Sequence, residues 1–307
     1  MSDDPSAWPD IPLASWSATC ETLHRWSQIV GKTRLALTPL VNHWWNVTLY
    51  VTPRGLATSA IPCASGSRCF EIVFDFLAHR LTIETSDDRS ETLALAPISV
   101  KDFYAEFKER LRRLGIEVRI WTMPSEIENA VPFDRDTVHA DYDPVYVQRF
   151  FQAMLQSDRV LKQFRARFLG KASPVHFFWG SFDLAVTRFS GRRAPPPKGS
   201  TPNVASRVMA EAYSHEVSSC GFWPGNGGYG RAAYYVYAYP EPAEYGKTKL
   251  RTADAFYDEG LGQFILPYDT VRRAADPDAL LLGFLQETYA AAADLARWDR
   301  AALERPA

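Results

Sequence analysis

Histidine side chains and one neighbouring carboxylate are the groups in this sequence best suited to catalysis or metal binding. The histidines stand at positions 24, 43, 79, 139, 176 and 215, and no two have the i, i+4 spacing of a helical metal pair. His43 and His176 each begin a row of alternating residues, and Glu216 follows His215 directly. Two histidines and one carboxylate suit a divalent metal such as iron or zinc. The candidate metal ligands are therefore His43, His176, His215 and Glu216.

A second hypothesis uses the same side chains without a metal. His176 or His215 would act as a general base, and Asp183 or Glu216 would orient its ring. The catalytic residues would then be His176, His215 and Glu216. The alternative is that each histidine only caps a backbone group at the edge of a sheet. A serine hydrolase is not indicated, because Ser181 lacks the second glycine of the nucleophile elbow.

Aromatic residues indicate a ligand pocket. The chain has 9 tryptophans, 14 tyrosines and 18 phenylalanines, and several of them flank a proline-rich segment at 192–203 or a glycine-rich segment at 221–230. Such rings can stack on a planar or apolar ligand, and an arginine can hold its carboxylate or phosphate. Core packing and solvated surface charge are the alternatives. The residues predicted to bind a ligand are Trp45, Phe178, Asp183, Arg188, Phe222 and Trp223.

Composition narrows the classes of partner. With 34 basic and 36 acidic residues the formal net charge is -2, so no general basic field would attract a nucleic acid. No segment approaches the roughly 20 apolar residues of a membrane span. The four cysteines contain no CxxC pair, and the start lacks the charged region and apolar run expected of a signal peptide. We therefore expect a cytoplasmic protein that binds a small-molecule ligand, with neither a nucleic acid nor a membrane as a partner.

The first half of the chain shows helical spacing once and then mainly strand patterns. Apolar residues between 21 and 30 predict a helix that Gly31 ends. Ser99 and Asp102 form a capping pair for a second helix, which Gly115 closes. Alternating side chains predict the strands between and after these helices. These strands cover 43–52, 69–77, 80–85, 92–95 and 118–122.

The second half repeats this combination of elements. Asp143 and Pro144 start a long helix that runs to Gly170, and Asp276 with Pro277 starts the last one. Alternation predicts a single strand over the whole of 176–187. Two shorter strands are expected at 233–239 and 263–266, and the two loop segments lie between them and the first strand.

The order of elements predicts an α+β fold of two similar halves. Each half would have a helix, a mostly antiparallel meander and a second helix, with the two sheets joined or facing. Both halves also contain a Gly-Lys pair, a proline and then a histidine with two aromatics, at 43–45 and 176–178. Internal duplication would explain this, and chance is the alternative. We expect a loose arm at 1–12, a first half at 13–125 and a second half at 126–307, which together form one compact unit.

Three stretches are distinctive enough to carry a resemblance. They read TLHRWSQIVGKTRLALTPLVNHWWNVTLYVTPRGL, SPVHFFWGSFDLAVTRFSGRRAPPP and AYSHEVSSCGFWPG. With them the chain resembles, over roughly Trp8 to Trp298, a family of bacterial proteins known only as a domain of unknown function. The resemblance implies a bacterial cytoplasmic protein of about this size. It implies no catalytic residue, because no activity accompanies the family.

These observations lead to one functional hypothesis and one alternative. The hypothesis is a small-molecule enzyme with a histidine-rich aromatic pocket between the halves, covered by residues 222–229 and able to hold iron or zinc. The alternative is a non-catalytic binding or scaffold protein whose histidines are structural.

Overall fold

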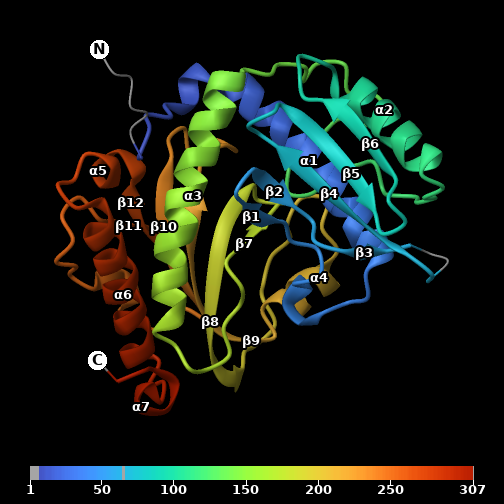
Figure 1. Ribbon diagram of the computed structural model, residues 1–307. Coiled ribbons are helices and arrows are strands. Elements are labelled where there is room, and N and C mark those ends of the chain that lie inside the picture. The colour runs from blue at the N-terminus through green and yellow to red at the C-terminus, as the bar shows by residue number, and fades with distance from the viewer. Residues whose placement is uncertain (1–6, 64–65, 307) are drawn as a thin grey trace.

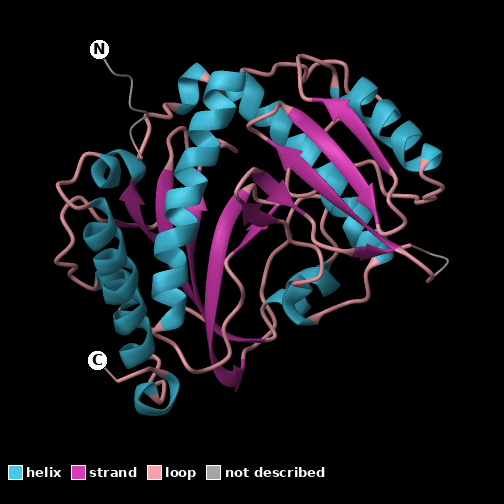
Figure 2. Cartoon of the chain, viewed as in Figure 1, coloured by secondary structure: helices cyan, strands magenta, loops and turns pink. Residues whose placement is uncertain are grey.

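The computed structural model describes residues 7–63 and 66–306, and it has an α+β fold in which helices pack around two antiparallel sheets (Figures 1 and 2). The α-helices are α1 (Ser17–Leu37), α2 (Val100–Arg113), α3 (Pro144–Ala166), α4 (Ser206–Ala212), α5 (Tyr268–Arg272), α6 (Pro277–Leu295) and α7 (Arg300–Leu303). Short 3-10 helices are η1 (Leu13–Ser15), η2 (Asn42–Trp44) and η3 (Tyr245–Lys247).

Each sheet has six strands. The first contains β1 (Tyr50–Thr52), β2 (Gly55–Ala57), β3 (Ile61–Pro62), β4 (Cys69–Asp75), β5 (Arg80–Thr85) and β6 (Ser90–Ala94). Its order is β1-β2-β4-β5-β6, with β3 paired to β4. The second contains β7 (His176–Phe178), β8 (Asp183–Arg193), β9 (His215–Trp223), β10 (Ala233–Tyr239), β11 (Phe256–Asp258) and β12 (Gln263–Pro267). Its order is β11-β12-β10-β9-β8-β7, so the expected α+β class with two antiparallel sheets is confirmed.

The two sheets meet at a short bridge. Leu49 and Phe177 exchange backbone hydrogen bonds of 2.9 and 2.7 Å, which join the start of β1 to β7. Helices α3 and α6 lie side by side against one face of the second sheet (Figure 1). Loops and the N-terminal half of the chain lie over the other face of that sheet. No helix within 7–63 and 66–306 is both long and apolar enough to cross a membrane.

Helix α1 is the central helix of the molecule, and it is longer than expected. Every residue from Thr22 to Arg34 is buried, so protein surrounds the helix on all sides. Gly31 does not end it. A Cβ at that position would lie 2.1 Å from the indole of Trp179, so this glycine lets the Trp179 ring lie directly against the helix. The helix ends at Leu37, two residues before Pro39, which cannot continue a helix.

The predicted helix starts at Asp143 and Asp276 are confirmed. Asp143 accepts hydrogen bonds from the amides of the second and third residues of α3, at 2.9 and 3.2 Å. Asp276 accepts one from Ala279 in α6, at 3.0 Å. Ser99 caps α2 in the same way. These side chains satisfy amides that the first helical turn leaves unpaired, which is why short local patterns located all three starts.

The strand predicted over 43–52 was wrong for most of its length. His43 and Trp44 have positive φ angles of 57 and 62°, and residues 42–44 form the turn η2. Only residues 50–52 pair as a strand. Since 176–178 is a true strand, the two matching histidine-aromatic strings have different backbone conformations and do not support a duplication. Residues 118–122 are also outside both sheets.

The single strand predicted over 176–187 is instead a hairpin of β7 and β8. The turn between the strands contains Phe182, with a φ of 61°. In the antiparallel register Phe178 lies opposite Asp183, and His176 lies opposite Ala185. Directly opposed residues share a face of the sheet. The turn therefore brings Phe178 and Asp183 to the same face, whereas an unbroken strand would separate them.

The segment predicted as a loose arm packs onto the core where the structure describes it. Trp8 is 7% exposed and Ile11 is 3% exposed. The backbone oxygen of Pro9 accepts a hydrogen bond of 2.9 Å from Tyr268. Residues 1–6 of the predicted arm lie outside the described residues. The apolar side chains at 8 and 11 thus join the same core as the two sheets.

Candidate functional site

A cleft of about 1150 Å³ lies over the face of the second sheet that α3 and α6 leave free. Alternate residues of the central strands form its floor, because successive side chains of a strand point to opposite faces. These are Asp183, Ala185, Thr187 and Phe189 of β8, Val217, Ser219 and Trp223 of β9, and Tyr235 and Tyr237 of β10. Helix α1, residues 43–47, the loop at 119–128 and residues 201–213 supply the walls.

Asp183 is the most unusual group on the floor of the cleft. It is only 6% exposed, and Tyr235 donates a hydrogen bond to its Oδ2. Desolvation raises the pKa of Asp183 to about 7, although the hydrogen bond from Tyr235 acts in the opposite direction; the nearby Glu126 raises it further. The carboxyl therefore exists in both protonation states near neutral pH.

A glycine makes the contact between Tyr235 and Asp183 possible. Tyr235 is on β10 and Asp183 is on β8, so the phenol has to pass over the strand between them. Gly221 of β9 lies directly opposite Tyr235. A Cβ on Gly221 would be 2.5 Å from the Tyr235 hydroxyl and 2.3 Å from a backbone oxygen. Gly221 thus leaves the space through which the phenol reaches the carboxyl.

Glu126 brings a second carboxyl to the cleft from the loop at 119–128. Its backbone has a φ of 62°, and its amide is held by a 2.8 Å hydrogen bond to the oxygen of Pro202. Ser181 donates a 2.7 Å hydrogen bond to Oε2. A Cβ on Gly180 would lie 2.1 Å from Oε1, so this glycine makes room for the carboxyl. Although Glu126 is open to the cleft, desolvation by the surrounding walls raises its pKa.

His24 connects three parts of the cleft wall through its two ring nitrogens. Its Nε2 donates to the oxygen of Gly180 at 2.8 Å, and its Nδ1 accepts from Asn226 at 3.3 Å. Asn226 accepts in turn from the Trp223 indole at 2.8 Å. Burial lowers the pKa of His24 to about 4, so the ring is neutral above that pH. The chain of hydrogen bonds fastens the glycine-rich loop to α1.

The residues that the sequence predicted to bind a ligand fall into two groups. Trp45, Phe178, Asp183 and Trp223 all line the cleft. Arg188 and Phe222 instead lie on the opposite face of the sheet. The guanidinium of Arg188 lies 3.5 Å from the centre of the Phe164 ring and 4.2 Å from that of Tyr289, between α3 and α6. Phe222 packs on aromatic rings of the same core.

Two of the predicted metal ligands, His43 and His215, are close neighbours. Their ring centres are 5.7 Å apart. Nδ1 of His43 donates to the oxygen of Ala212 at 3.2 Å, and its Nε2 accepts from the Lys171 ammonium at 2.6 Å. Desolvation and the charge of Lys171 lower the pKa of His43. The ring nitrogens of His43 are thus already engaged with protein partners, and only His43 of this pair lines the cleft.

His176 and Glu216 are placed elsewhere. His176 is fully buried against the rings of Trp45, Tyr50 and Phe178, and neither of its ring nitrogens has a hydrogen-bond partner among the described residues. Desolvation lowers its pKa to about 3. Glu216 points to the other face of β9 from His215, where it pairs with Arg192 at 2.7 Å.

The four predicted ligands therefore do not converge on one point. Within 7–63 and 66–306, no group of three or more histidine, cysteine, aspartate or glutamate side chains is arranged to hold a metal ion. Glu216, the carboxylate of the predicted set, lies on the other face of the sheet from His215. Adjacent residues of one strand cannot both face the same site, and this is why His215 and Glu216 diverge.

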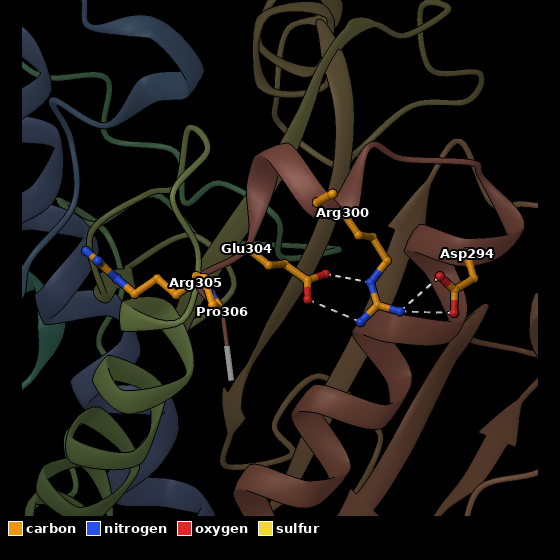
Figure 3. A pocket seen from close by; sticks show the side chains of 6 residues that line it. Asp294, Arg300, Glu304, Arg305 and Pro306 are labelled. Atoms are coloured by element: carbon orange, nitrogen blue, oxygen red, sulfur yellow. Dashed lines mark hydrogen bonds and ion pairs between the residues drawn. The ribbon is translucent and has the colours of Figure 1, made fainter.

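A second depression lies at the C-terminal end of the chain, and Figure 3 shows why it is a poor candidate. Arg300 lies between two carboxylates, with Glu304 at 2.6 Å and Asp294 at 3.0 Å. Each charge is already balanced by a neighbour. The side chains of Arg305 and Pro306 complete this open surface. None of the residues that line it is buried, so the cleft is the stronger candidate.

Comparison with known proteins places the chain in a family. A family model matches residues 8–305, which is nearly the whole chain. The chain belongs to that family, a family of unknown function (DUF5996). The family resemblance expected from the sequence is thereby confirmed. No curated protein and no solved structure matches the chain.

The sequence analysis missed several cleft residues, among them Lys32, Glu126 and Asn226. Lys32 directly follows Gly31, at which the sequence analysis ended the helix, so no helical pattern marked it as buried. Glu126 lies in a loop without a recognisable motif. Asn226 belongs to the glycine-rich segment, and this was the one signal that could have identified it. Their roles depend on contacts far apart in the sequence, such as Asn226 with His24.

Proposed function

We propose that the cleft is the active site of an enzyme that acts on a small organic molecule, with Asp183 as the group that donates or accepts a proton. The observation that carries this proposal is the buried carboxyl of Asp183 at the floor of a large cleft. The pKa of this carboxyl is about 7. General acid-base catalysis works best when the pKa of the catalytic group is near the operating pH. Strongly shifted carboxyls in clefts are typical of active sites.

Tyr235 serves as the positioning residue for this carboxyl. Its hydroxyl donates to Oδ2, which leaves Oδ1 as the atom that exchanges a proton with a bound molecule. Burial raises the pKa of Tyr235 far above neutrality, so the phenol keeps its own proton. The hydrogen bond stabilises the ionised carboxyl and thereby limits how far burial can raise the pKa of Asp183.

The walls indicate the kind of molecule that would fit. Trp45, Phe178 and Trp223 present partly exposed rings to the cleft, and such rings stack on planar or apolar groups. Glu126 and Ser181 add polar groups beside Asp183 that would orient the ligand. A cleft of this volume is ample for a ligand of metabolite size.

We place this activity in the reducing cytoplasm of a bacterium. All four cysteines, Cys20, Cys63, Cys69 and Cys220, are free thiols. Proteins of oxidising compartments more often pair such residues in disulfides. The family resemblance noted for the sequence agrees with this location.

A ligand screen followed by one substitution tests the proposal. Metabolites that raise the melting temperature of the wild-type protein would be incubated with it, and their conversion would be followed by mass spectrometry. Asp183→Asn keeps the shape of the side chain but cannot transfer a proton. We expect a loss of kcat of about 100-fold or more, with the ligand Kd changed only a few-fold.

The matched control is Asp141→Asn, at an exposed aspartate outside the cleft, which should leave kcat unchanged. Equal turnover by the wild-type and Asp183→Asn proteins would contradict the proposal. Binding of a ligand that the wild-type protein never converts would favour the alternative, a non-catalytic binding protein. The enclosed position of His176 is the observation that supports this alternative, because it makes at least one histidine structural.

A further inference from the structure

Lys32 is a buried amine on the wall of the cleft. The residue is 5% exposed and belongs to α1. Its Nζ donates hydrogen bonds to the backbone oxygen of Met123 at 2.9 Å and to Oγ of Ser125 at 3.0 Å. Both acceptors are uncharged. Among the residues that the structure describes, none places a carboxylate within ion-pair distance of this nitrogen.

Aromatic rings enclose the same nitrogen. Nζ lies 4.9 Å from the centre of the Trp121 ring and 5.9 Å from the centres of the Phe133 and Trp179 rings. Gly31, the residue before Lys32, is what allows the Trp179 indole to approach α1 so closely. The rings partly compensate a positive charge through their π faces, but they do not replace the water that a surface lysine would have.

This environment makes the neutral amine more populated at neutral pH than it is in an ordinary lysine. Desolvation lowers the pKa of Lys32 to about 8. A neutral amine has two N–H bonds and one lone pair. The oxygens of Met123 and Ser125 accept the two hydrogens, so the lone pair remains for a reaction partner. Since Lys32 lines the cleft, the residue borders the space that a bound molecule would occupy.

The other lysines show how unusual this combination is. Lys162 forms an ion pair with Asp158, and Lys247 forms one with Glu244. Lys171 donates to His43 and is exposed. Lys32 alone in this comparison combines burial, neutral acceptors and an opening onto a cleft. A purely structural lysine would need only the first two features.

We propose that Lys32 captures a carbonyl compound in the cleft as a covalent imine. This inference rests on the proposed function, since it assigns an aldehyde or ketone as the substrate class of the same cleft. The Lys32 amine would be the nucleophile, Ser125 a positioning residue for it, and the aromatic walls would hold the rest of the substrate.

The reaction balances without a further co-reactant. The lone pair of Nζ attacks the carbonyl carbon, and the π electrons of the carbonyl move to its oxygen. A proton passes from the new ammonium to that oxygen and gives a carbinolamine. The hydroxyl then takes up a proton from the solvent and leaves as water while the nitrogen lone pair forms the C=N bond, and the remaining N–H proton returns to the solvent. The net change is amine plus carbonyl to imine plus water.

Reductive trapping with benzaldehyde tests the inference. The wild-type protein would be incubated with benzaldehyde and sodium cyanoborohydride at pH 7.5, and the labelled lysines would be identified by tryptic peptide mapping. A benzylated Lys32 resists trypsin and yields an uncut peptide of residues 26–34. Because an ordinary lysine has a pKa of about 10.4, we expect Lys32 to be labelled at least about tenfold faster than the exposed Lys101.

Three variants make the test specific. Lys32→Arg keeps the positive charge but should abolish the labelled 26–34 peptide. Ser125→Ala removes one acceptor and should slow labelling at Lys32 while leaving Lys101 unaffected. Asp183→Asn should still be labelled at Lys32, which separates this inference from the role proposed for Asp183. Near-ultraviolet circular dichroism checks that each variant is folded.

Labelling of Lys32 at or below the rate of Lys101 in the folded wild-type protein would overturn the inference. This comparison needs no substitution, so it holds even if a variant fails to fold. Fast labelling that benzaldehyde concentration does not saturate would also count against a binding cleft around the amine. Saturable labelling confined to Lys32 is the supporting result.

Discussion

Each face of strand β8 carries a buried ionisable group, and the two groups have different surroundings. On one face Asp183 is 6% exposed and lines the cleft. On the other face Arg188 is fully buried between α3 and α6, where its guanidinium stacks on aromatic rings. Burial lowers the pKa of Arg188 to about 10, so it keeps its charge at neutral pH. Asp183 does not keep a single protonation state there.

This difference shows that burial alone is not enough to identify a functional side chain. Arg188 is enclosed by two helices, and a ligand cannot reach it without displacing them. Asp183 is shielded from bulk water but open to a cavity that a ligand can fill. Access from a cavity, together with a pKa near the working pH, is what makes a buried charge useful for chemistry.

Removal of the Arg188 side chain is the strongest way to probe the enclosed face. Arg188→Ala leaves a large cavity between α3 and α6 and removes the stacking on Phe164 and Tyr289. We expect a loss of about 3 kcal/mol in the free energy of unfolding, measured with urea. Arg193→Ala, at an exposed position on the same strand, should change it by less than about 0.5 kcal/mol. A similar loss for both variants would contradict the assigned structural role.

His176 shows that lying on the cleft face of the sheet is not enough to make a buried group accessible to a ligand. It shares a face of the sheet with Asp183, yet aromatic rings cover it. Its pKa is about 3 in the folded protein, below that of an unfolded histidine, so the unfolded state binds more protons between about pH 3 and 6.5. The stability of the wild-type protein should therefore fall as the pH decreases through this range.

His176→Leu removes this acid-dependent loss of stability. At pH 5 the variant should gain about 2 kcal/mol relative to the wild-type protein, compared with the difference between them at pH 8. Urea unfolding at the two pH values measures this change. If the difference between variant and wild type is the same at both pH values, His176 is not held neutral by its enclosure.

Tyr235→Phe has the smallest expected effect on stability, and it tests how Tyr235 controls the pKa of Asp183 on the cleft face. The substitution removes the hydrogen bond that stabilises ionised Asp183, so the pKa of Asp183 should rise by about one unit. Any activity that requires the ionised carboxyl would then need a correspondingly higher pH. The unfolding free energy should fall by about 1 kcal/mol. An unchanged pH profile would show that Tyr235 does not influence the carboxyl.

Features coded by a few neighbouring residues could be predicted from the sequence. The aspartate caps at Asp143 and Asp276 are local, and the structure has both. Helix α1 extends beyond its predicted end because surrounding protein buries all sides of it, which overrides the tendency of Gly31 to stop a helix. The positive φ angles at His43 and Trp44 also depend on the tertiary structure, since these residue types rarely adopt them alone.

In the candidate site, too, local sequence patterns predicted some features, and contacts between distant residues determined the others. Asp183, Trp45, Phe178 and Trp223 were predicted as ligand-binding residues, and the structure places all four on the cleft. Arg188 was assigned to the same group because it stands close to the proline-rich segment, and proximity in sequence does not show on which face of the sheet a side chain lies. The importance of Asp183 comes from Tyr235, which is 52 positions away in sequence. Local patterns contain no information about such a contact.

The titration of the Asp183 carboxyl tests the central claim most directly. Infrared difference spectra between the wild-type protein and Asp183→Asn isolate the carbonyl band of the protonated acid, which can be followed from pH 4 to pH 9. We predict that this band disappears with a midpoint near pH 7. A midpoint near pH 4, the value of an ordinary aspartate, would contradict the assignment of Asp183 as the proton-transfer group of the cleft.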